Sequence, residues 1–383
     1  MKPLKIVICG LSITSSWGNG HATTYRALMS ELSAAGHEVW FLERDRPWYA
    51  ENRDLPNPPY GRTELYTSLE DLKLRFTDPI ASADAVIVGS FVPEGIALGA
   101  WVIQVARGLR VFYDIDTPET LASIGEGSSE YLSRELIPKY DLYLSFTGGP
   151  TLKRLETEFN SPMARALYCS VDARQYYPAE SRSCRDLGYL GTFSWDRQAT
   201  LEEFLLKPAR LWSEGRFIVA GAQFPSELDW GPNVEHLAHL PPSDHRDFYN
   251  GLRFTLNITR RNMIQAGYSP SVRLFEAAAC ATPIISDYWP GIETLFEPGT
   301  EILIAEKAQD VSRMICGISD RERRKIGERA RARVLNAHTA AHRVGELERH
   351  LRDALSRRNR YSMSKAERTS TCQQTPADNC VNQ

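Results

Sequence analysis

Residues 269–287, SPSVRLFEAAACATPIISD, contain the start of a predicted helix followed by a candidate strand. Ser269 is a favourable N-cap residue, and Pro270 suits the first helical position because its missing N–H costs nothing there. The first charge of this helix is the cation Arg273, although the positive end of a helix dipole favours acids. An arginine at a helix start therefore indicates a site for an anion, which the dipole and free N–H groups already attract.

The alternation of helix and strand continues on both sides of this stretch. We expect strands at 4–10, 38–43, 84–90, 110–116, 141–146 and 164–169, and then at 186–191, 216–221, 234–240, 254–259, 283–287 and 301–305. Continuous apolar strands separated by helices are typical of parallel sheets that helices cover on both faces. The sequence therefore predicts an α/β fold of two Rossmann-like domains that face each other across a cleft.

The predicted organisation has five parts. They are an N-terminal domain (1–168), a polar, proline-containing hinge (169–185), a C-terminal domain (186–340), a C-terminal helix (341–356) and a tail (357–383). The tail has few large apolar residues, so we expect it to be disordered.

Composition excludes several classes of protein. The 383-residue chain is 42% hydrophobic and 24% charged, with a net charge of −3, so we expect no nucleic-acid partner and at most peripheral membrane contact. No apolar run approaches the roughly 20 residues that span a bilayer. The seven cysteines form no CxxC pair, which argues against a disulfide framework or a structural zinc and favours a reducing cytoplasm.

Three segments resemble one enzyme family. The segment LYCSVDARQYYP (167–178), between two such domains, is similar to the hinge of GT-B glycosyltransferases. Residues 271–305 resemble the donor-binding signature of group 1 glycosyltransferases, with most likeness to the CgeB-like, spore-maturation branch. The segment NAHTAAHR (336–343) is similar to the C-terminal mark of that branch. The resemblance implies an enzyme that moves a sugar from a nucleoside-diphosphate sugar to an acceptor hydroxyl.

Two positions depart from the family pattern. Ala281 stands where relatives usually have glycine, and Tyr268 stands where retaining group 1 enzymes have the first glutamate of a paired-glutamate motif. Both retention and inversion of the anomeric configuration therefore stay open at this point.

The predicted donor site centres on the helix that starts near Ser269. Ser269 and Ser271 belong to the loop before the helix, and Arg273 is placed to neutralise the diphosphate, including the charge that grows as it leaves. Glu276, one turn deeper, accepts the ribose hydroxyls in the role that its match in the family implies. The alternative is a surface ion pair between Arg273 and Glu276, worth only about 0.2–0.5 kcal/mol.

Two further strand ends belong to the same predicted cleft. In YLGTFSWDRQ (189–198), Gly191 allows close backbone approach and Arg197 is placed to reach a phosphate, since open α/β sheets bind ligands at such turns. In TLNITRRNM (255–263), Arg260 is the candidate that points into the cleft. The alternative for Arg197 and for Arg260 is a position exposed to solvent.

The predicted acceptor side lies in the N-terminal domain. The Gly- and Ser-rich loop 10–28 includes Gly18, Asn19 and Gly20 and leads to His21 at a helix entry, where the imidazole is a candidate base or sugar-hydroxyl ligand. A purely structural histidine is the alternative.

Two carboxylates follow a strand of the same domain. Asp114 and Asp116 alternate, so we expect both to point towards the ligand, with Asp116 as the general base because it lies at the strand end. Their Asp-x-Asp spacing could suggest a metal site, but the pair lies in the acceptor half. We therefore expect no metal and no cofactor beyond the nucleotide-sugar donor.

Three other functions stay open. GNGHAT (18–23) resembles a degraded dinucleotide-binding loop, and Glu43 stands near the position of a ribose-binding acid, as in an NAD-dependent oxidoreductase. The others are a sugar-nucleotide epimerase and a non-catalytic nucleotide-sugar-binding protein. The sugar, the nucleotide base and the acceptor (a glycan, lipid, small molecule or protein) stay open as well, since a few polar contacts decide them.

Overall fold

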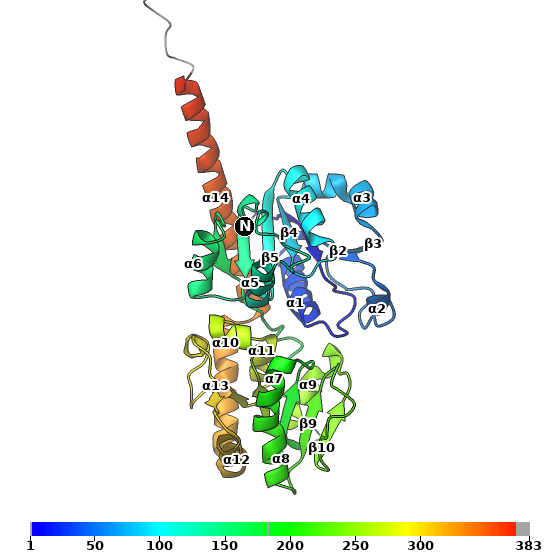
Figure 1. The fold of residues 1–383 in the computed structure, drawn as a ribbon, viewed down its shortest axis with the longest axis vertical. Helices are drawn as coiled ribbons and strands as arrows, with labels where there is room; N and C mark the ends of the chain where they lie inside the picture. The colour runs from blue at the N-terminus through cyan, green and yellow to red at the C-terminus, as the bar shows by residue number, and fades with distance from the viewer. Residues whose placement is uncertain (1, 182–183, 373–383) are drawn as a thin grey trace, which may run out of the picture.

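The computed structural model describes residues 2–181 and 184–372, which form two α/β domains stacked along the long axis of the molecule (Figure 1). The N-terminal sheet has seven strands in the order β3-β2-β1-β4-β5-β6-β7, and the C-terminal sheet has six in the order β10-β9-β8-β11-β12-β13. All pairings within these two sheets are parallel. The predicted pair of Rossmann-like domains is confirmed.

The strands agree closely with those predicted. In the N-terminal sheet they are β1 (Lys5–Gly10), β2 (Glu38–Arg44), β3 (Arg62–Tyr66), β4 (Ala85–Gly89), β5 (Leu109–Asp114), β6 (Leu142–Ser145) and β7 (Ala164–Ala166). In the C-terminal sheet they are β8 (Arg185–Leu190), β9 (Phe217–Ala220), β10 (Val234–Leu237), β11 (Leu252–Asn257), β12 (Ile284–Ser286) and β13 (Leu303–Ile304). Of the strands in the described residues, β3 alone was not predicted. It is an edge strand whose sequence, RTELY, is too polar to show the apolar pattern of a buried strand.

Helices connect most successive strands in both domains, although none is described between β9 and β10. The N-terminal domain contains α1 (His21–Ala34), α2 (Pro47–Ala50), α3 (Leu69–Ala81), α4 (Gly95–Val105), α5 (Thr117–Glu126), η1 (Ile137–Lys139) and α6 (Pro150–Thr157). The C-terminal domain contains α7 (Trp195–Leu201), the π-helix η2 (Glu202–Leu206), α8 (Lys207–Leu211), α9 (Pro242–Asn250), α10 (Arg261–Ala266), α11 (Val272–Ala279), η3 (Ile292–Thr294), α12 (Ala308–Gly317) and α13 (Asp320–Ala337). The last helix is α14 (Ala340–Cys372).

Side chains of one strand pack on both faces of its sheet. In β1, Ile6 and Ile8 belong to the core shared with α1, whereas Val7 and Cys9 belong to the core on the opposite face. This arrangement follows from the two-residue period of a strand and explains why the strands are apolar throughout.

The chain returns to the N-terminal domain after α13. Thr339 pairs with Val171 of the hinge in an isolated parallel bridge, and α14 then packs along α1. Arg343, buried at the start of α14, donates to the carbonyl of Tyr168 at 3.1 Å and to Nδ1 of His338 at 2.7 Å. These bonds tie the end of the C-terminal domain to the end of the N-terminal domain, directly before the hinge.

The prediction that the tail is disordered is wrong over residues 357–372. These residues continue α14, which extends beyond the N-terminal domain in Figure 1. Low hydrophobicity predicted disorder, but arginine, lysine, alanine and glutamate in this stretch have high helix propensity and extend a helix that is already nucleated. The remaining part of the expected tail, 373–383, lies outside the described residues.

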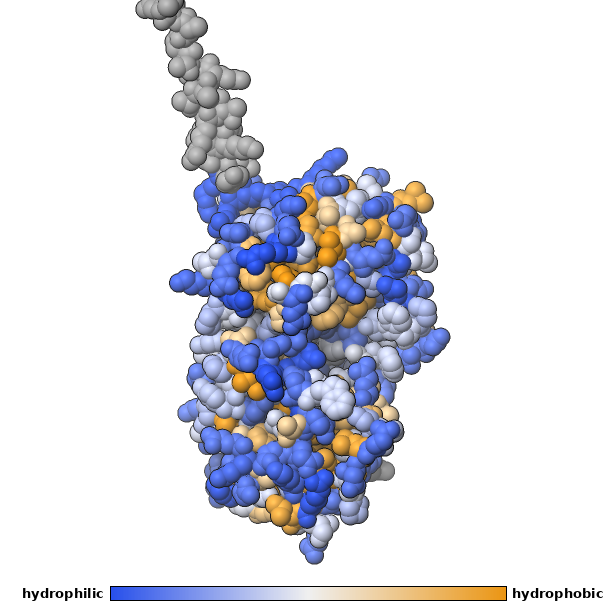
Figure 2. Space-filling view, in the orientation of Figure 1, coloured by the Kyte–Doolittle hydropathy of each residue, from blue (hydrophilic) through white to orange (hydrophobic). Residues whose placement is uncertain are grey.

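The outer face of the molecule has a mixed character. Figure 2 shows hydrophilic and hydrophobic residues interspersed on this face of both domains. Among the helices in the described part of the chain, none is both long and apolar enough to cross a membrane.

Candidate functional site

A cavity of about 590 Å³ lies between the two domains. Its walls come from loops at the carboxyl ends of the strands, including residues 190–193 after β8, 258–260 after β11 and 115–116 after β5. Ligands of open α/β sheets bind at this edge, so the cavity is where the fold predicts a site.

Three arginines of the C-terminal domain line this cavity. They are Arg197 in α7, Arg260 before α10 and Arg273 in α11, all of which the sequence had singled out. The nearest carboxylate to Arg260 is Glu119 of the N-terminal domain, at 4.0 Å. Within residues 2–181 and 184–372, neither Arg197 nor Arg273 has a carboxylate within ion-pair distance.

The three arginines lie close enough to repel one another. Burial lowers the pKa of Arg197, and the positive charges of Arg273 and Arg260 lower it further, whereas Tyr189 and Asp196 act in the opposite direction. Among the described residues, Nε of both Arg197 and Arg260 is buried without a hydrogen-bond partner. Positive charges gathered at a cavity attract anions, so this wall is a candidate anion site.

Arg273 is held in place by neutral groups. Its Nε donates to the carbonyl of Leu190, its Nη1 donates to Oδ1 of Asn257 at 3.1 Å, and its guanidinium lies 4.9 Å from the centroid of the Tyr189 ring. Gly191 makes this position available, because a Cβ there would lie 2.6 Å from Nη2 of Arg273. The glycine was predicted from the approach of a ligand, and the structure adds the approach of this arginine.

Glu276 is buried one turn deeper in α11 and also lines the cavity. Tyr176 donates to its Oε1 at 3.1 Å, Tyr249 donates to its Oε2 at 3.2 Å, and Nδ1 of His245 lies 3.4 Å from Oε2. The surface ion pair between Arg273 and Glu276 is therefore excluded, since both side chains are buried and bound to other partners.

The N-cap prediction at Ser269 is wrong. Helix α11 begins at Val272 and its N-cap is Ser271, whose backbone is extended (φ −73°, ψ 152°). Ser271 Oγ donates to Asn257 at 2.8 Å, and the residue lines the cavity. Ser269 is buried instead at the contact between the domains, where its hydroxyl lies 2.8 Å from that of Thr147.

His21 and Asp116 meet on the opposite wall. His21 is the first residue of α1, and its Nε2 lies 2.7 Å from Oδ2 of Asp116, the residue before α5. The two side chains keep 10% and 20% of their surface accessible, respectively, and both residues line the cavity. Residues 95 positions apart, each predicted separately, therefore form one pair.

The loop before His21 has a fixed shape. Oδ1 of Asn19 accepts from the backbone N–H of His21 at 3.0 Å, and Gly18 has a φ of 58°, which glycine adopts without strain. Gly18, Asn19 and Gly20 all line the cavity, as the acceptor-side prediction requires.

Glu43 does not serve as a ribose-binding acid. It is fully buried, and it accepts from the backbone N–H groups of Ile13 at 2.7 Å and Thr14 at 3.0 Å and from the hydroxyls of Ser12 and Thr14. Its function is to hold the loop, which removes the main support for a dinucleotide site.

The prediction that Asp114 faces the ligand is wrong. Asp114 is fully buried, accepts from Tyr143 at 2.6 Å and from Thr120 at 2.8 Å, and is absent from the cavity lining. The two-residue alternation fails because β5 ends at Asp114, whereas Asp116 follows a turn. Burial raises the pKa of Asp114 to about 6.

Several residues of the site were not predicted. They are Asn257 and Tyr189, which position Arg273, Tyr176, His245 and Tyr249, which position Glu276, and Phe91 on the N-terminal wall. A polar residue at a strand end is a signal that could have identified Asn257. The tyrosines resemble core residues in the sequence, so nothing marked them.

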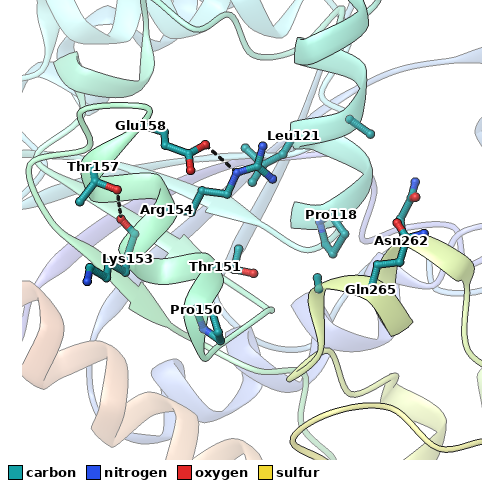
Figure 3. A pocket seen from close by; sticks show the side chains of 12 residues that line it. Pro118, Leu121, Pro150, Thr151, Lys153, Arg154, Thr157, Glu158, Asn262 and Gln265 are labelled. Atoms are coloured by element: carbon teal, nitrogen blue, oxygen red, sulfur yellow. Dashed lines mark hydrogen bonds and ion pairs between the residues drawn. The ribbon is translucent and has the colours of Figure 1, made fainter.

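A second cavity, of about 640 Å³, lies between α5 and α6 of one domain and α10 of the other. Figure 3 shows that Arg154 in its wall points to Glu158, and the two side chains are 2.8 Å apart. This cavity has no histidine in its lining and its arginine is already neutralised, so the first cavity is the better candidate site.

No group of three or more histidine, cysteine, aspartate or glutamate side chains that could hold a metal ion occurs in the part of the chain that the structure describes. Independence of metal stays a prediction.

Comparison with known proteins agrees with this geometry. Residues 197–349 match a family model described as glycosyl transferase-like. No curated protein matches the chain at a significant level.

Solved structures of several glycosyltransferases share the fold of this chain. Sucrose-phosphate synthase from Thermosynechococcus elongatus has a TM-score of 0.66 at 15% identity, over 91% of this chain and 99% of that one. Anabaena HepE in complex with UDP and glucose has a TM-score of 0.68 at 14% identity, over 91% and 100%. An alpha-glucosyltransferase in complex with UDP-glucose and DNA has a TM-score of 0.68 at 13% identity, over 91% and 99%. The fold is therefore GT-B.

Proposed function

We propose that this protein transfers a sugar from a nucleoside-diphosphate sugar to an acceptor hydroxyl. The observation that carries the proposal is the cavity itself, in which Arg197, Arg260 and Arg273 face the His21–Asp116 pair. The family match and the fold support the same reaction class.

The two walls divide the chemistry. The bond between the anomeric carbon and the β-phosphate oxygen breaks, and the diphosphate leaves with the electron pair, so negative charge grows beside the arginines. Preorganised cations in a partly buried site stabilise that charge. Glu276, fixed by two tyrosines, accepts hydrogen bonds from the ribose hydroxyls.

The acceptor oxygen forms the new bond to the anomeric carbon, and its proton passes to the His21–Asp116 pair. A carboxylate 2.7 Å from the imidazole fixes the orientation of the ring. Asp116 and His21 thus act as a unit. A non-catalytic nucleotide-sugar-binding protein would have no use for this pair, and the engagement of Glu43 by the loop disfavours an NAD-dependent oxidoreductase.

Finer properties complete the proposal. We propose a UDP-sugar donor because HepE and the alpha-glucosyltransferase are described in complex with UDP or UDP-glucose, and the CgeB-like branch because of residues 271–305 and 336–343. We further propose that the protein acts in the cytoplasm. We also propose that transfer needs no metal ion, since three arginines supply the positive charge.

A thermal-shift series in EDTA tests this function. UDP, GDP, dTDP, CDP and NAD are added to the full chain, and a ligand of the native state raises the melting temperature. We expect a shift with at least one nucleoside diphosphate and none with NAD. A shift with NAD alone would contradict the proposal.

A further inference from the structure

The N-terminal wall of the cavity combines apolar and polar side chains. Its apolar surface comes from Leu11, Tyr49, Phe91, Ile115 and Phe146, and its polar side chains include Ser16, Asn19, Thr23 and the His21–Asp116 pair. No arginine or lysine of this domain lines the cavity. An anionic acceptor would find no counter-charge here, whereas a neutral molecule with an apolar face would fit.

Phe91 has an unusual backbone on this wall. It lies in the turn after β4 with a φ of 59°, a left-handed conformation that costs a bulky residue roughly 1–2 kcal/mol. It also leaves 40% of its surface exposed, although it is a large apolar residue. Such strain at a cavity suggests a functional constraint on the residue.

The ring of Phe91 is supported from behind. It lies 4.5 Å, centroid to centroid, from the ring of Tyr131, which is 7% exposed. The Tyr131 hydroxyl is 2.8 Å from that of Thr120, which in turn donates to Asp114. Gly95 adds to this support, because a Cβ there would lie 2.7 Å from the Tyr131 backbone. The ring is therefore a fixed surface.

Phe91 also adjoins the proposed base. The imidazole of His21 lies 5.6 Å from its ring centroid in an edge-on arrangement, at an interplanar angle of 73°. A ring stacked on Phe91 would bring its hydroxyl substituents next to the His21–Asp116 pair.

We propose that Phe91 is a stacking platform for the acceptor, and that the acceptor presents a neutral sugar ring. A pyranose has an apolar C–H face that packs on an aromatic ring, and hydroxyls at its edge that reach the base. This inference rests on the proposed function, since it names the substrate class for the same cavity. The strained backbone holds the ring where the acceptor needs it.

Transfer assays on the full chain test the platform. The donors are nucleotide sugars of the nucleoside diphosphate that the thermal-shift series identifies, and the acceptors are neutral methyl glycopyranosides, acyclic sorbitol and anionic glucuronate. Phe91→Gly suits the positive φ and removes the ring, whereas Phe91→Tyr keeps it. Tyr288→Ala, which alters an aromatic residue that is 54% exposed and outside the cavity lining, is the matched control.

We expect Phe91→Gly to raise the KM for methyl glycopyranosides about tenfold, the scale of one lost aromatic contact. The KM for sorbitol, the dissociation constant of the nucleoside diphosphate and the melting temperature should change little. Phe91→Tyr and Tyr288→Ala should behave as the wild type.

Four results would overturn the platform: an unchanged KM in Phe91→Gly, an equal rise for sorbitol, a wild-type preference for glucuronate, or no transfer to any methyl glycopyranoside. In each of these cases diphosphate binding and donor turnover would still support the proposed function. Loss of both in the wild type would instead remove the proposed function, and the platform with it.

Discussion

The two walls of the cavity differ in the kind of group that each presents. The C-terminal wall presents Arg197, Arg260, Arg273 and the fixed carboxylate Glu276, whereas the N-terminal wall presents apolar and neutral polar side chains around the His21–Asp116 pair. Cationic side chains therefore gather on one wall, and the proposed acid–base pair lies on the other.

This difference shows how a two-domain fold divides a transfer reaction. The leaving diphosphate needs several cations, and burial together with repulsion from Arg273 and Arg260 lowers the pKa of Arg197. The acceptor needs a single proton transfer and a shaped surface. Substitutions on the two walls should therefore have separable effects on donor binding and on turnover.

The largest effect is expected at Asp116. Asp116→Asn should lower turnover by about 10²–10⁴, the usual cost of losing a general base or the group that orients it. The dissociation constant of the nucleoside diphosphate should stay the same, because Asp116 lies on the other wall. Steady-state kinetics and titration calorimetry measure the two quantities. Glu126→Gln, at an exposed position of α5, is the control, and turnover within a few-fold of wild type would assign Asp116 a structural role.

Asp114, two residues before Asp116, provides a test of stability rather than of catalysis. Since the pKa of Asp114 is raised to about 6, its protonated form stabilises the fold fully below pH 4, and this contribution is lost as the pH rises through about 6. Asp114→Asn cannot ionise, so its free energy of unfolding relative to wild type should improve by up to about 3 kcal/mol between pH 4 and pH 7.

Denaturant unfolding at several pH values measures this change. A constant offset between variant and wild type would contradict the raised pKa of Asp114.

Two adjacent arginines sharpen the comparison on the donor wall. Arg260→Ala should weaken binding of the nucleoside diphosphate by about 1.5 kcal/mol, or roughly tenfold, because a charged hydrogen bond is lost. Arg261→Ala should have no effect, since Arg261 is exposed and outside the cavity lining. Titration calorimetry compares the two variants, and equal losses would indicate a general field effect rather than a contact.

The smallest effect concerns strain away from the cavity. Ala281 has a φ of 56° directly after the C-cap of α11, a left-handed conformation that glycine adopts without strain. Ala281→Gly should therefore increase the free energy of unfolding by about 0.5–1 kcal/mol without changing activity. Unfolding midpoints in urea test this. A loss of stability would show that the methyl group of Ala281 matters more than its backbone.

The fold could be predicted almost completely from the sequence. Apolar strands such as β1 and β4 are buried on both faces, so their composition identifies them, whereas the polar edge strand β3 gave no such signal. The continuation of α14 past residue 356 was not predicted. Low hydrophobicity indicated disorder there, whereas the helix propensity of the same residues favours the helix.

The candidate site could be predicted only in part. Arg273, Glu276, His21 and Asp116 stand at element boundaries where ligands bind, and all of them line the cavity. The pairing of His21 with Asp116 depends on tertiary structure, and so does the burial of Asp114. Asp114 ends β5 and is buried, whereas Asp116 lies two residues beyond the strand end and lines the cavity.

The most direct test compares two variants with two ligands by titration calorimetry. Arg273→Ala should weaken the nucleoside diphosphate by about 1.5–3 kcal/mol and leave the bare nucleoside almost unaffected, because only the former carries phosphate. Glu276→Ala should weaken both ligands alike, because both carry the ribose. Affinities that stay equal to wild type in all four combinations would contradict the assignment of this cavity as the donor site.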